Sequence, residues 1–405
     1  MKTKILRHTF ISVGVLFILA RLLAAGTSDG VLDFNDTSLG SSPVIITFDA
    51  PGAGTGAMQG TLAFAINQAG TIAGDFFTPS PVTRGYVRGS DGTFIEFDAP
   101  GGGTGPYQGT FVEAMDDSAG AITGFTRDSS DVFHGYVRSP SGAFTTFDAP
   151  GAGTGQFQGT EGDNINATGM ITGNYVDSSN VNHGFVGAAN GTITAFDAPG
   201  AGTGPGQGTF VSSVDCLTDA GATVGEYLDA SNVYHGFLRV PDGTITAFDA
   251  PGAGTGPNQG TQCLGINETG TILGIYIDSS NVNHGFEHAP NGTFTFINVS
   301  GAGTGPGQGT LPENINASGA ITGYYIDSSD VNHGFLSTPD GAITTFDAPG
   351  AGTGPGQGTI SACNNAADAV TGFYLDSNNT WHGFMRAAPR AQPTPRPRPT
   401  PPPRP

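Results

Sequence analysis

The chain has 405 residues, of which 66 are glycine and only 12% are charged, and its formal net charge is -20. So acidic a chain should repel nucleic acid and anionic membranes, which excludes nucleic-acid binding as its function. Thr, Val, Ile, Phe and Tyr dominate between the glycines, whereas lysine occurs only twice. This composition predicts an all-β protein with many tight turns.

The N-terminal segment predicts secretion. Lys2, Lys4 and Arg7 precede an apolar run at 10–20, and small residues follow at 24–26. This order is typical of a signal peptide, and the run is too short to span a bilayer comfortably. We expect a signal peptide over 1–25 and a linker over 26–43, with an uncleaved anchor as the alternative. The expected location is extracellular, at a bacterial cell surface or in the periplasm, and after cleavage the protein is not integral to the membrane.

One motif organises the rest of the chain. Phe-Asp-Ala-Pro-Gly-Ala-Gly-Thr-Gly begins at Phe48 and returns, with small changes, at Phe97, Phe147, Phe196, Phe248, Phe296 and Phe346. The sixth copy departs most and is matched at Phe296, where Ile297 and Asn298 replace Asp-Ala. A regular period of about 50 residues indicates a repeat architecture.

Each copy predicts four short strands. In one copy they cover 309–316, 320–326, 333–337 and 342–346, separated by turns such as Asp340-Gly341. Four antiparallel strands per 50-residue repeat are typical of a β-propeller blade. The first strand, at 44–48, is a fourth strand without partners, and the last copy lacks its fourth strand. We therefore expect a seven-bladed β-propeller over 44–387, closed where 44–48 docks beside 382–387, because closure removes exposed sheet edges.

The repeats resemble the HAF-type extracellular repeat proteins of bacteria. The resemblance rests on Ile-Asn-Ala-Ser-Gly-Ala-Ile-Thr-Gly at 315–323, on His333-Gly334-Phe335 and on the Asp-Gly turn. It covers nearly the whole chain from 44 to 387, although glycine replaces the alanine for which the family is named. The resemblance implies a secreted bacterial repeat protein and no particular activity.

The C-terminal segment 388–405 is rich in proline and arginine. Proline cannot enter the interior of a sheet or helix, so we expect a disordered, extended tail. It is either a solvated spacer or a basic tether to an anionic cell surface or to the protein's own acidic body.

Aspartate recurs at two places in the repeat. In an antiparallel blade the fourth-to-first loop and the second-to-third turn lie at the same end, so both sets are expected on one rim. The loop set forms a candidate acidic rim for Ca²⁺, other cations or sugar hydroxyls: Asp49, Asp98, Asp148, Asp197, Asp249 and Asp347. The alternative is that each aspartate only caps its own loop or turn.

Six histidines each follow a turn aspartate by six residues. The expected pairs are Asp128 with His134, Asp177 with His183, Asp229 with His235, Asp278 with His284, Asp327 with His333, and Asp376 with His382. In the first copy Thr78 and Arg84 replace both members together, which suggests contact across the hairpin. A His–Asp hydrogen bond could begin a catalytic site, but six copies without a placed nucleophile favour a structural bond.

Two further patterns have ordinary interpretations. The glycine-rich stretch 350–358 is a poor phosphate-binding loop, because no Lys-Ser/Thr or helix follows, and glycine suits a tight crossing between blades. Cys216, Cys263 and Cys363 are expected to be buried thiols, although one disulfide is possible.

These patterns predict a secreted, monomeric, non-enzymatic binding or surface-associated protein without an obligatory cofactor. Carbohydrate or a cell-envelope component is the expected partner. The alternatives are a carbohydrate-active propeller enzyme, either a glycosidase or a lyase, and a purely structural envelope component. An enzyme would need one asymmetric site, and the positions that differ between copies are Arg84, Arg88, Glu226, Glu287, His288 and Trp381.

Overall fold

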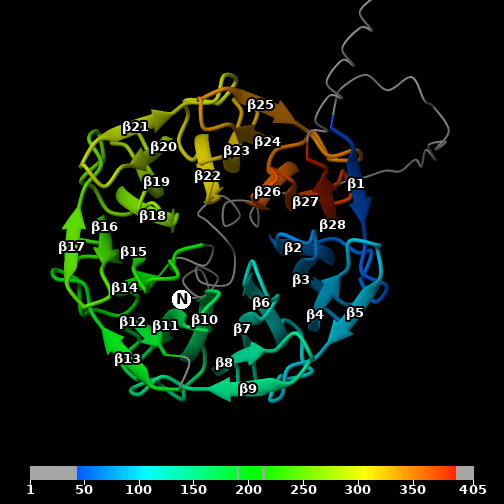
Figure 1. The fold of residues 1–405 in the computed structure, drawn as a ribbon, viewed down its shortest axis with the longest axis horizontal. Helices are drawn as coiled ribbons and strands as arrows, with labels where there is room; N and C mark the ends of the chain where they lie inside the picture. Colours follow the sequence, from blue (N-terminus) through cyan, green and yellow to red (C-terminus); the bar gives the residue numbers. More distant parts are fainter. Residues whose placement is uncertain (1–42, 189–190, 212–214, 389–405) are drawn as a thin grey trace, which may run out of the picture.

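The computed structural model describes residues 43–188, 191–211 and 215–388, so the predictions for the signal peptide, most of the linker and the tail lie outside the described residues. Every regular element in this part of the chain is a β-strand, and the 28 strands form one closed ring around a central opening (Figure 1). The expected all-β propeller is thus confirmed. None of the described segments is a helix long and apolar enough to cross a membrane.

The strands fall into seven groups of four, here called blades one to seven. The inner strands are β2 (Gly60–Ile66), β6 (Gly109–Met115), β10 (Gly159–Ile165), β14 (Gly208–Val211), β18 (Gly260–Ile266), β22 (Gly309–Ile315) and β26 (Gly358–Asn364). The second strands are β3 (Ile72–Phe77), β7 (Ile122–Arg127), β11 (Ile171–Val176), β15 (Thr223–Leu228), β19 (Ile272–Ile277), β23 (Ile321–Ile326) and β27 (Val370–Leu375).

The third strands are β4 (Thr83–Arg88), β8 (Phe133–Arg138), β12 (Asn182–Gly187), β16 (Tyr234–Arg239), β20 (Asn283–His288), β24 (Asn332–Ser337) and β28 (Trp381–Arg386). The outer strands are β5 (Phe94–Phe97), β9 (Phe144–Phe147), β13 (Ile193–Phe196), β17 (Ile245–Phe248), β21 (Phe294–Ile297), β25 (Ile343–Phe346) and β1 (Ile45–Phe48). Blade one is β2 to β5, and each following group of four makes the next blade.

Blade seven joins the two ends of the described chain. Its strands β26, β27 and β28 come last in the sequence, whereas its outer strand is β1 (Figure 1). β1 pairs antiparallel with β28 and places Phe48 opposite Gly383. The same pairing places Phe346 opposite Gly334 in blade six, so β1 occupies the position of an outer strand.

The core lies between the blades. The aromatic residue of the His-Gly-Phe motif is fully buried in every blade, at Tyr86, Tyr136, Phe185, Phe237, Phe286, Phe335 and Phe384. Burying one such side chain stabilises the fold by roughly 1.5–3 kcal/mol. All three cysteines are buried as well, which confirms the expectation of buried thiols.

A glycine starts each inner strand because two blades approach closely there. Gly309 has φ of 122°, and a Cβ atom at this position would lie 2.0 Å from the carbonyl oxygen of Asn283. Gly309 and Asn283 form the single parallel bridge between blades five and six. A side chain would therefore force the blades apart.

The predicted alignment of the sixth copy is wrong by one residue. The structure pairs Ile297, and not Phe296, with Gly285, just as Phe346 pairs with Gly334. Ile297 therefore takes the place of the motif's Phe, Asn298 that of its Asp, and Phe296 is 43% exposed. The aromatic pattern alone could not fix the register, because a slip of one residue turns every side chain to the other face of the sheet.

Candidate functional site

The blade-to-blade loops and the turns between second and third strands meet at one end of the ring, here called the rim. In the loop between blades six and seven, the Gly356 N–H donates to the Asp330 carbonyl oxygen of the neighbouring turn at 2.6 Å. The Gln357 carbonyl oxygen accepts from the Asn332 N–H at 2.8 Å. These bonds tie each loop to a turn and bring both sets of aspartates to the rim.

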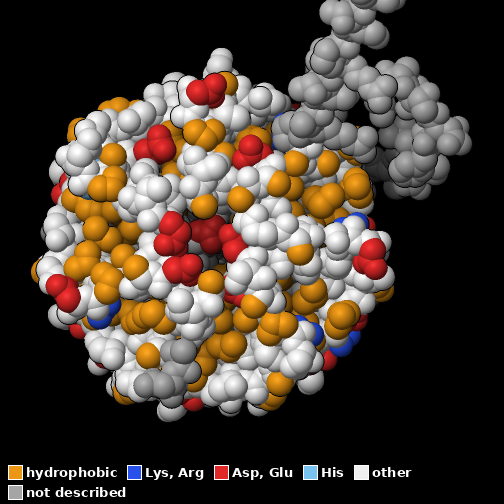
Figure 2. Space-filling model, viewed as in Figure 1, with side chains coloured by type: hydrophobic (Ala, Val, Ile, Leu, Met, Phe, Trp, Pro, Cys, Tyr) orange, Lys and Arg blue, Asp and Glu red, His pale blue; other side chains and the backbone are white. Residues whose placement is uncertain are grey.

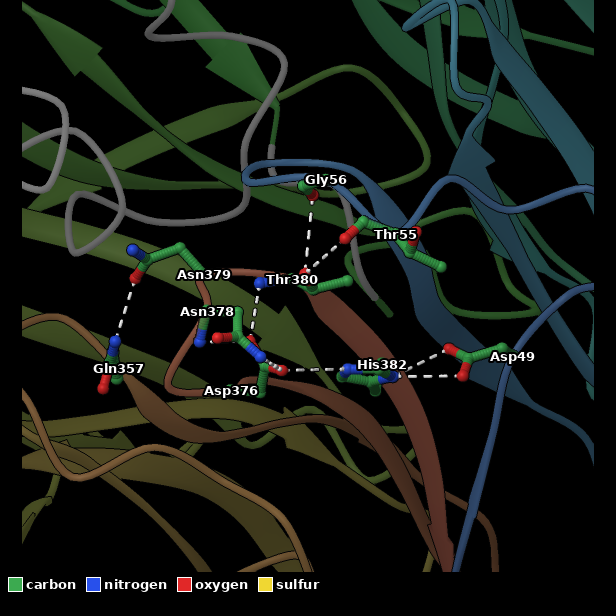
Figure 3. Close-up of polar contacts among 9 residues, drawn as sticks. All are labelled: Asp49, Thr55, Gly56, Gln357, Asp376, Asn378, Asn379, Thr380 and His382. Atoms are coloured by element: carbon green, nitrogen blue, oxygen red, sulfur yellow. Dashed lines mark hydrogen bonds and ion pairs between the residues drawn. The ribbon is translucent and has the colours of Figure 1, made fainter. Parts of the chain in front are cut away.

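The rim histidines lie between one aspartate of each set. In blade seven, His382 Nδ1 lies 3.0 Å from Asp49 Oδ1, and its Nε2 lies 3.7 Å from Asp376 Oδ2 (Figure 3). The sequence suggested only the second of these contacts, which is the longer one. Asp49 follows β1, far from His382 in the sequence, so its contact with His382 could not be read from local spacing.

Four other blades repeat this arrangement. The Nδ1 contacts measure 2.8–2.9 Å for His134 with Asp148, His183 with Asp197, His235 with Asp249, and His333 with Asp347. The Nε2 contacts measure 3.6–3.8 Å for the same histidines with Asp128, Asp177, Asp229 and Asp327. Both ring nitrogens of these histidines face carboxylates.

Blades one and five depart from this arrangement. In blade five, His284 Nε2 lies 3.2 Å from Asp278, and Asn298 takes the loop position. In blade one, Arg84 replaces the histidine, and its Nε and Nη2 donate to the two oxygens of Asp98 at 2.9 Å. Its Nη1 donates to Glu96 at 3.0 Å. The hydrogen bond and charge of Asp98, together with the charge of Glu96, raise the pKa of Arg84.

The turn aspartates also bond to their own backbone. Asp177 Oδ1 accepts hydrogen bonds from the N–H groups of Ser179 and Val181, both at 2.8 Å. Within the described ranges, no three His, Cys, Asp or Glu side chains are grouped so that they could hold a metal ion. Calcium binding at the rim therefore stays a prediction.

A tyrosine ring supports five of the histidines. Tyr374 stacks on His382 with ring centroids 4.9 Å apart, and Tyr175, Tyr227, Tyr276 and Tyr325 stack on their own histidines in the same way. Burial lowers the pKa of His382, but the hydrogen bond and charge of Asp49 and the charge of Asp376 outweigh it and raise the pKa overall. Burial raises the pKa of Tyr374 to about 12.

A pocket of about 240 Å³ lies in the rim between blades one and two, and we call it the rim pocket. Its walls include Arg84, Asp98, Gly102 and Thr110. The two terminal nitrogens of Arg84 carry four N–H groups in all. One of these groups bonds Asp98 and one bonds Glu96, so two remain for a ligand. The pocket therefore offers donors and acceptors side by side.

The repeat is broken at two residues that line the rim pocket and at one residue beside its loop. Arg84 replaces histidine, and Gly102 replaces the alanine found in the other loops at Ala53, Ala152, Ala201, Ala253, Ala302 and Ala351. A Cβ atom at Gly102 would lie 3.2 Å from the Gly109 backbone. Thr126 replaces the tyrosine of the later blades, and its buried Oγ1 has no hydrogen-bond partner among the described residues. Arg84 and Gly102 line the rim pocket, and Thr126 Oγ1 lies 3.8 Å from the position of a Cβ atom at Gly101 in the same loop.

A second pocket, of about 300 Å³, lies between blades five and six, and we call it the seam pocket. Its walls include Glu287, Phe296, Asn298, Thr338 and Ile343. Burial raises the pKa of the Glu287 carboxyl group. Of the positions that differ between copies, Arg84 and Glu287 thus line pockets.

Arg88 was wrongly predicted to differ between copies. Its guanidinium lies over the Phe48 ring at 4.7 Å, and Arg138, Arg239 and Arg386 lie in the same way over Phe97, Phe196 and Phe346 at 4.8–5.0 Å. His288 takes the place of this arginine in blade five and stacks on Phe294 at 4.3 Å. Trp381 is 1% exposed in the core. Glu226 of blade four lies near Gln262 of blade five, with 3.5 Å between Glu226 Oε1 and Gln262 Nε2.

Acidic side chains also gather around the central opening on the face seen in Figure 2. Two carboxyl groups in the body of the ring, Asp75 on β3 and Glu161 on β10, are 3% and 2% exposed. Burial raises the pKa of each to about 8.

The sequence analysis did not single out Asp75, Glu161, Gly102 or Thr126, which a position-by-position comparison of the seven copies would have found.

Comparison with known proteins identifies the fold alone. No protein-family model matches the chain, and no curated protein matches it either. A lectin from Burkholderia pseudomallei is similar in structure, with a TM-score of 0.50 and 11% identity over 86% of this chain and 98% of the lectin.

Two larger enzymes are also similar. A puromycin hydrolase gives a TM-score of 0.48 with 11% identity over 84% of this chain and 55% of the hydrolase. A prolyl endopeptidase gives 0.47 with 11% identity over 87% of this chain and 51% of the peptidase. The chain spans about half the length of these enzymes. The similarity to the lectin, at 11% identity, agrees with a β-propeller fold and shows no more than the fold.

Proposed function

We propose that this protein is a secreted, non-enzymatic binding propeller that takes a neutral carbohydrate in the rim pocket. The observation that carries this proposal is that Arg84 and Gly102, which both break the repeat, line the rim pocket. A third exception, Thr126, lies beside the same loop, with its Oγ1 3.8 Å from the position of a Cβ atom at Gly101. A repeat protein built from near-identical copies has no structural need to break its pattern three times at one place. The HAF-type resemblance supports secretion, and the similarity to a lectin supports a binding role.

The chemistry of the rim pocket favours an uncharged polyol. Arg84 carries one positive charge, whereas Asp98 and Glu96 together carry two negative charges, so an anionic ligand is repelled. Remaining N–H groups of Arg84 can donate to a sugar hydroxyl while Asp98, whose side chain is 61% exposed, accepts from the next one. Pairs of neighbouring hydroxyl groups on a sugar ring match this arrangement.

The rim histidines favour binding over catalysis. A general base needs a ring nitrogen that is open to the substrate, whereas both nitrogens face carboxylates in five blades. The glycosidase alternative finds support in Asp75 and Glu161, because a carboxyl group with a pKa of about 8 keeps a proton at neutral pH. Both groups are almost fully buried, however, so binding is the better-supported function.

A panel of neutral, amino and acidic sugars tests the proposal. We expect at least one neutral sugar to bind the purified protein and to raise its melting temperature, because a ligand of the native state stabilises it. The variants Gly102→Ala and Thr126→Tyr restore the common repeat, refill the gap and should weaken binding at least tenfold. Ala351→Gly, made in the loop of blade six, is the matched control and should leave binding unchanged. Failure of every neutral sugar would reject the proposal and favour a structural envelope component.

A further inference from the structure

At the seam between blades five and six, the third strand of blade five has an acidic residue at a position that is apolar in the six other blades. The third strand of each blade places one side chain beside the following blade, and this residue is Val87, Val137, Val186, Leu238, Leu336 or Met385. β20 has Glu287 at this position. Its neighbour across the sheet is Leu273, which is fully buried.

Among the residues that the structure describes, no side chain compensates for this carboxyl group. Glu287 forms no hydrogen bond or ion pair within the described residues, and no basic side chain lines the seam pocket. Burial raises the pKa of Glu287, as expected for a carboxylate taken from water without a partner. The six other blades show that an apolar side chain fits this position. Glu287 therefore lowers the stability of the seam relative to an apolar residue and makes no contact that offsets the loss among the described residues.

The walls around Glu287 have both apolar and polar parts. Phe296 and Ile343 are 43% and 37% exposed and line the pocket from adjacent outer strands. The Phe296 ring is held edge-on against Tyr276, with centroids 5.7 Å apart. Asn298, which replaces the rim aspartate in this blade alone, adds an exposed amide.

We propose that the seam pocket is a second binding site, which takes a protonated amine carried on a compact carbon frame, such as an amino sugar. The ammonium group lies at the Glu287 carboxylate, and the frame lies against Phe296 and Ile343. The amide of Asn298 is placed to bond hydroxyl groups of the ligand, whereas the Thr338 hydroxyl, which donates to Asp340, can only accept a hydrogen bond. This site is separate from the rim pocket and does not depend on what that pocket binds.

The charge of the pocket selects the amine. A carboxylate only accepts hydrogen bonds and carries a charge that no neighbouring side chain neutralises. A neutral sugar could donate hydrogen bonds to the half-buried carboxylate but would not balance its charge, and an anion would be repelled. An ammonium group supplies donors and the opposite charge together, and an exposed aromatic ring adds attraction for a cation.

Glucosamine, with glucose as its uncharged match, tests this site. We expect glucosamine to bind the full chain, measured by calorimetry at a pH that keeps the amine protonated, and glucose to bind at least tenfold more weakly. Glu287→Gln should weaken glucosamine binding at least tenfold. Glu287→Leu should abolish binding and raise the melting temperature of the free protein, because Leu238 and Leu336 occupy this position in other blades.

Two controls separate this proposal from the rim pocket and from a structural role. Gly102→Ala should leave glucosamine binding unchanged, whereas an effect there would assign the amine to the rim. A lower melting temperature for Glu287→Leu would show that Glu287 stabilises the fold and would overturn the proposal. Equal affinity for glucose and glucosamine, or no binding of glucosamine at all, would overturn it as well.

Discussion

His382 and Asp49 are 333 positions apart in the chain, yet His382 Nδ1 lies 3.0 Å from Asp49 Oδ1 at the point where the ring closes (Figure 3). The equivalent contact in blade six joins His333 and Asp347, which are only 14 positions apart. The closing blade therefore forms the same rim contact as a blade made from one continuous stretch.

The first prediction concerns ring closure. Phe48→Ala should lower the free energy of unfolding by about 2–3 kcal/mol, because the ring packs on the Arg88 guanidinium at 4.7 Å and faces Gly383. Phe346→Ala removes the equivalent ring from blade six, where Arg386 lies at 5.0 Å, and should cost a similar amount. Chemical denaturation measures both.

The two variants should differ in association. Within the described residues, the chain links β1 to the ring through the loop to β2, and strand pairing holds β1 to β28. Phe48→Ala should therefore release β1 and expose the edge of β28. Size-exclusion chromatography should show concentration-dependent association for Phe48→Ala alone. Identical behaviour of the two variants would contradict the special role of β1 in closure.

The second prediction concerns pH and His382. Its pKa is raised in the folded state above the ordinary value of 6.5, so the protonated histidine stabilises the fold. This contribution is fully present below pH 6.5 and is lost as the pH rises through the raised pKa. His382→Asn should lose this part of the pH dependence in urea unfolding from about pH 5 to about pH 9. If the free energy of unfolding of His382→Asn changed with pH as steeply as that of the natural protein, the prediction would be wrong.

The third prediction concerns Asp75. Its pKa is raised from 3.8 to about 8, so the folded state holds more protons than the unfolded state between these values. Stability should therefore fall as the pH rises across this window. Asp75→Asn should remove the fall and give a variant that melts higher than the natural protein at about pH 8.

Blade three contains the control for this change. Asn174 occupies the position of Asp75, and its Oδ1 accepts from the Val211 N–H at 2.6 Å, as Asp75 Oδ2 accepts from the Val112 N–H at 3.2 Å. An asparagine therefore keeps the hydrogen bond. A lower melting temperature for Asp75→Asn at alkaline pH would show that the charge itself is needed.

The fourth prediction compares two glycines. Gly309→Ala should destabilise the ring severely, because its Cβ atom would lie 2.0 Å from the Asn283 carbonyl oxygen. Gly292 also has positive φ, of 86°, but nothing lies within 4 Å of its Cβ position. Gly292→Ala should cost only about 1–2 kcal/mol, the cost of the left-handed backbone. Equal losses in thermal unfolding would refute the close approach of blades five and six.

The sequence by itself determined the repeat, the four strands of each blade and the all-β propeller. These follow from local rules, since turn residues and strand formers recur at a fixed period in every copy. The same rules placed the aspartates and histidines of the hairpins, because six residues across a tight turn bring two side chains together. They misplaced the sixth copy, since Phe-Thr-Phe-Ile fits a strand in either register.

Only the tertiary structure decided which side chains meet across blades. It showed that in five blades the loop aspartate lies closer to the histidine than the turn aspartate does. It also showed that Arg84 and Gly102 line one pocket, with Thr126 beside the same loop. It also showed that Glu287 lies in an apolar seam. These contacts depend on how one blade packs against the next, and no spacing within a repeat encodes that distance.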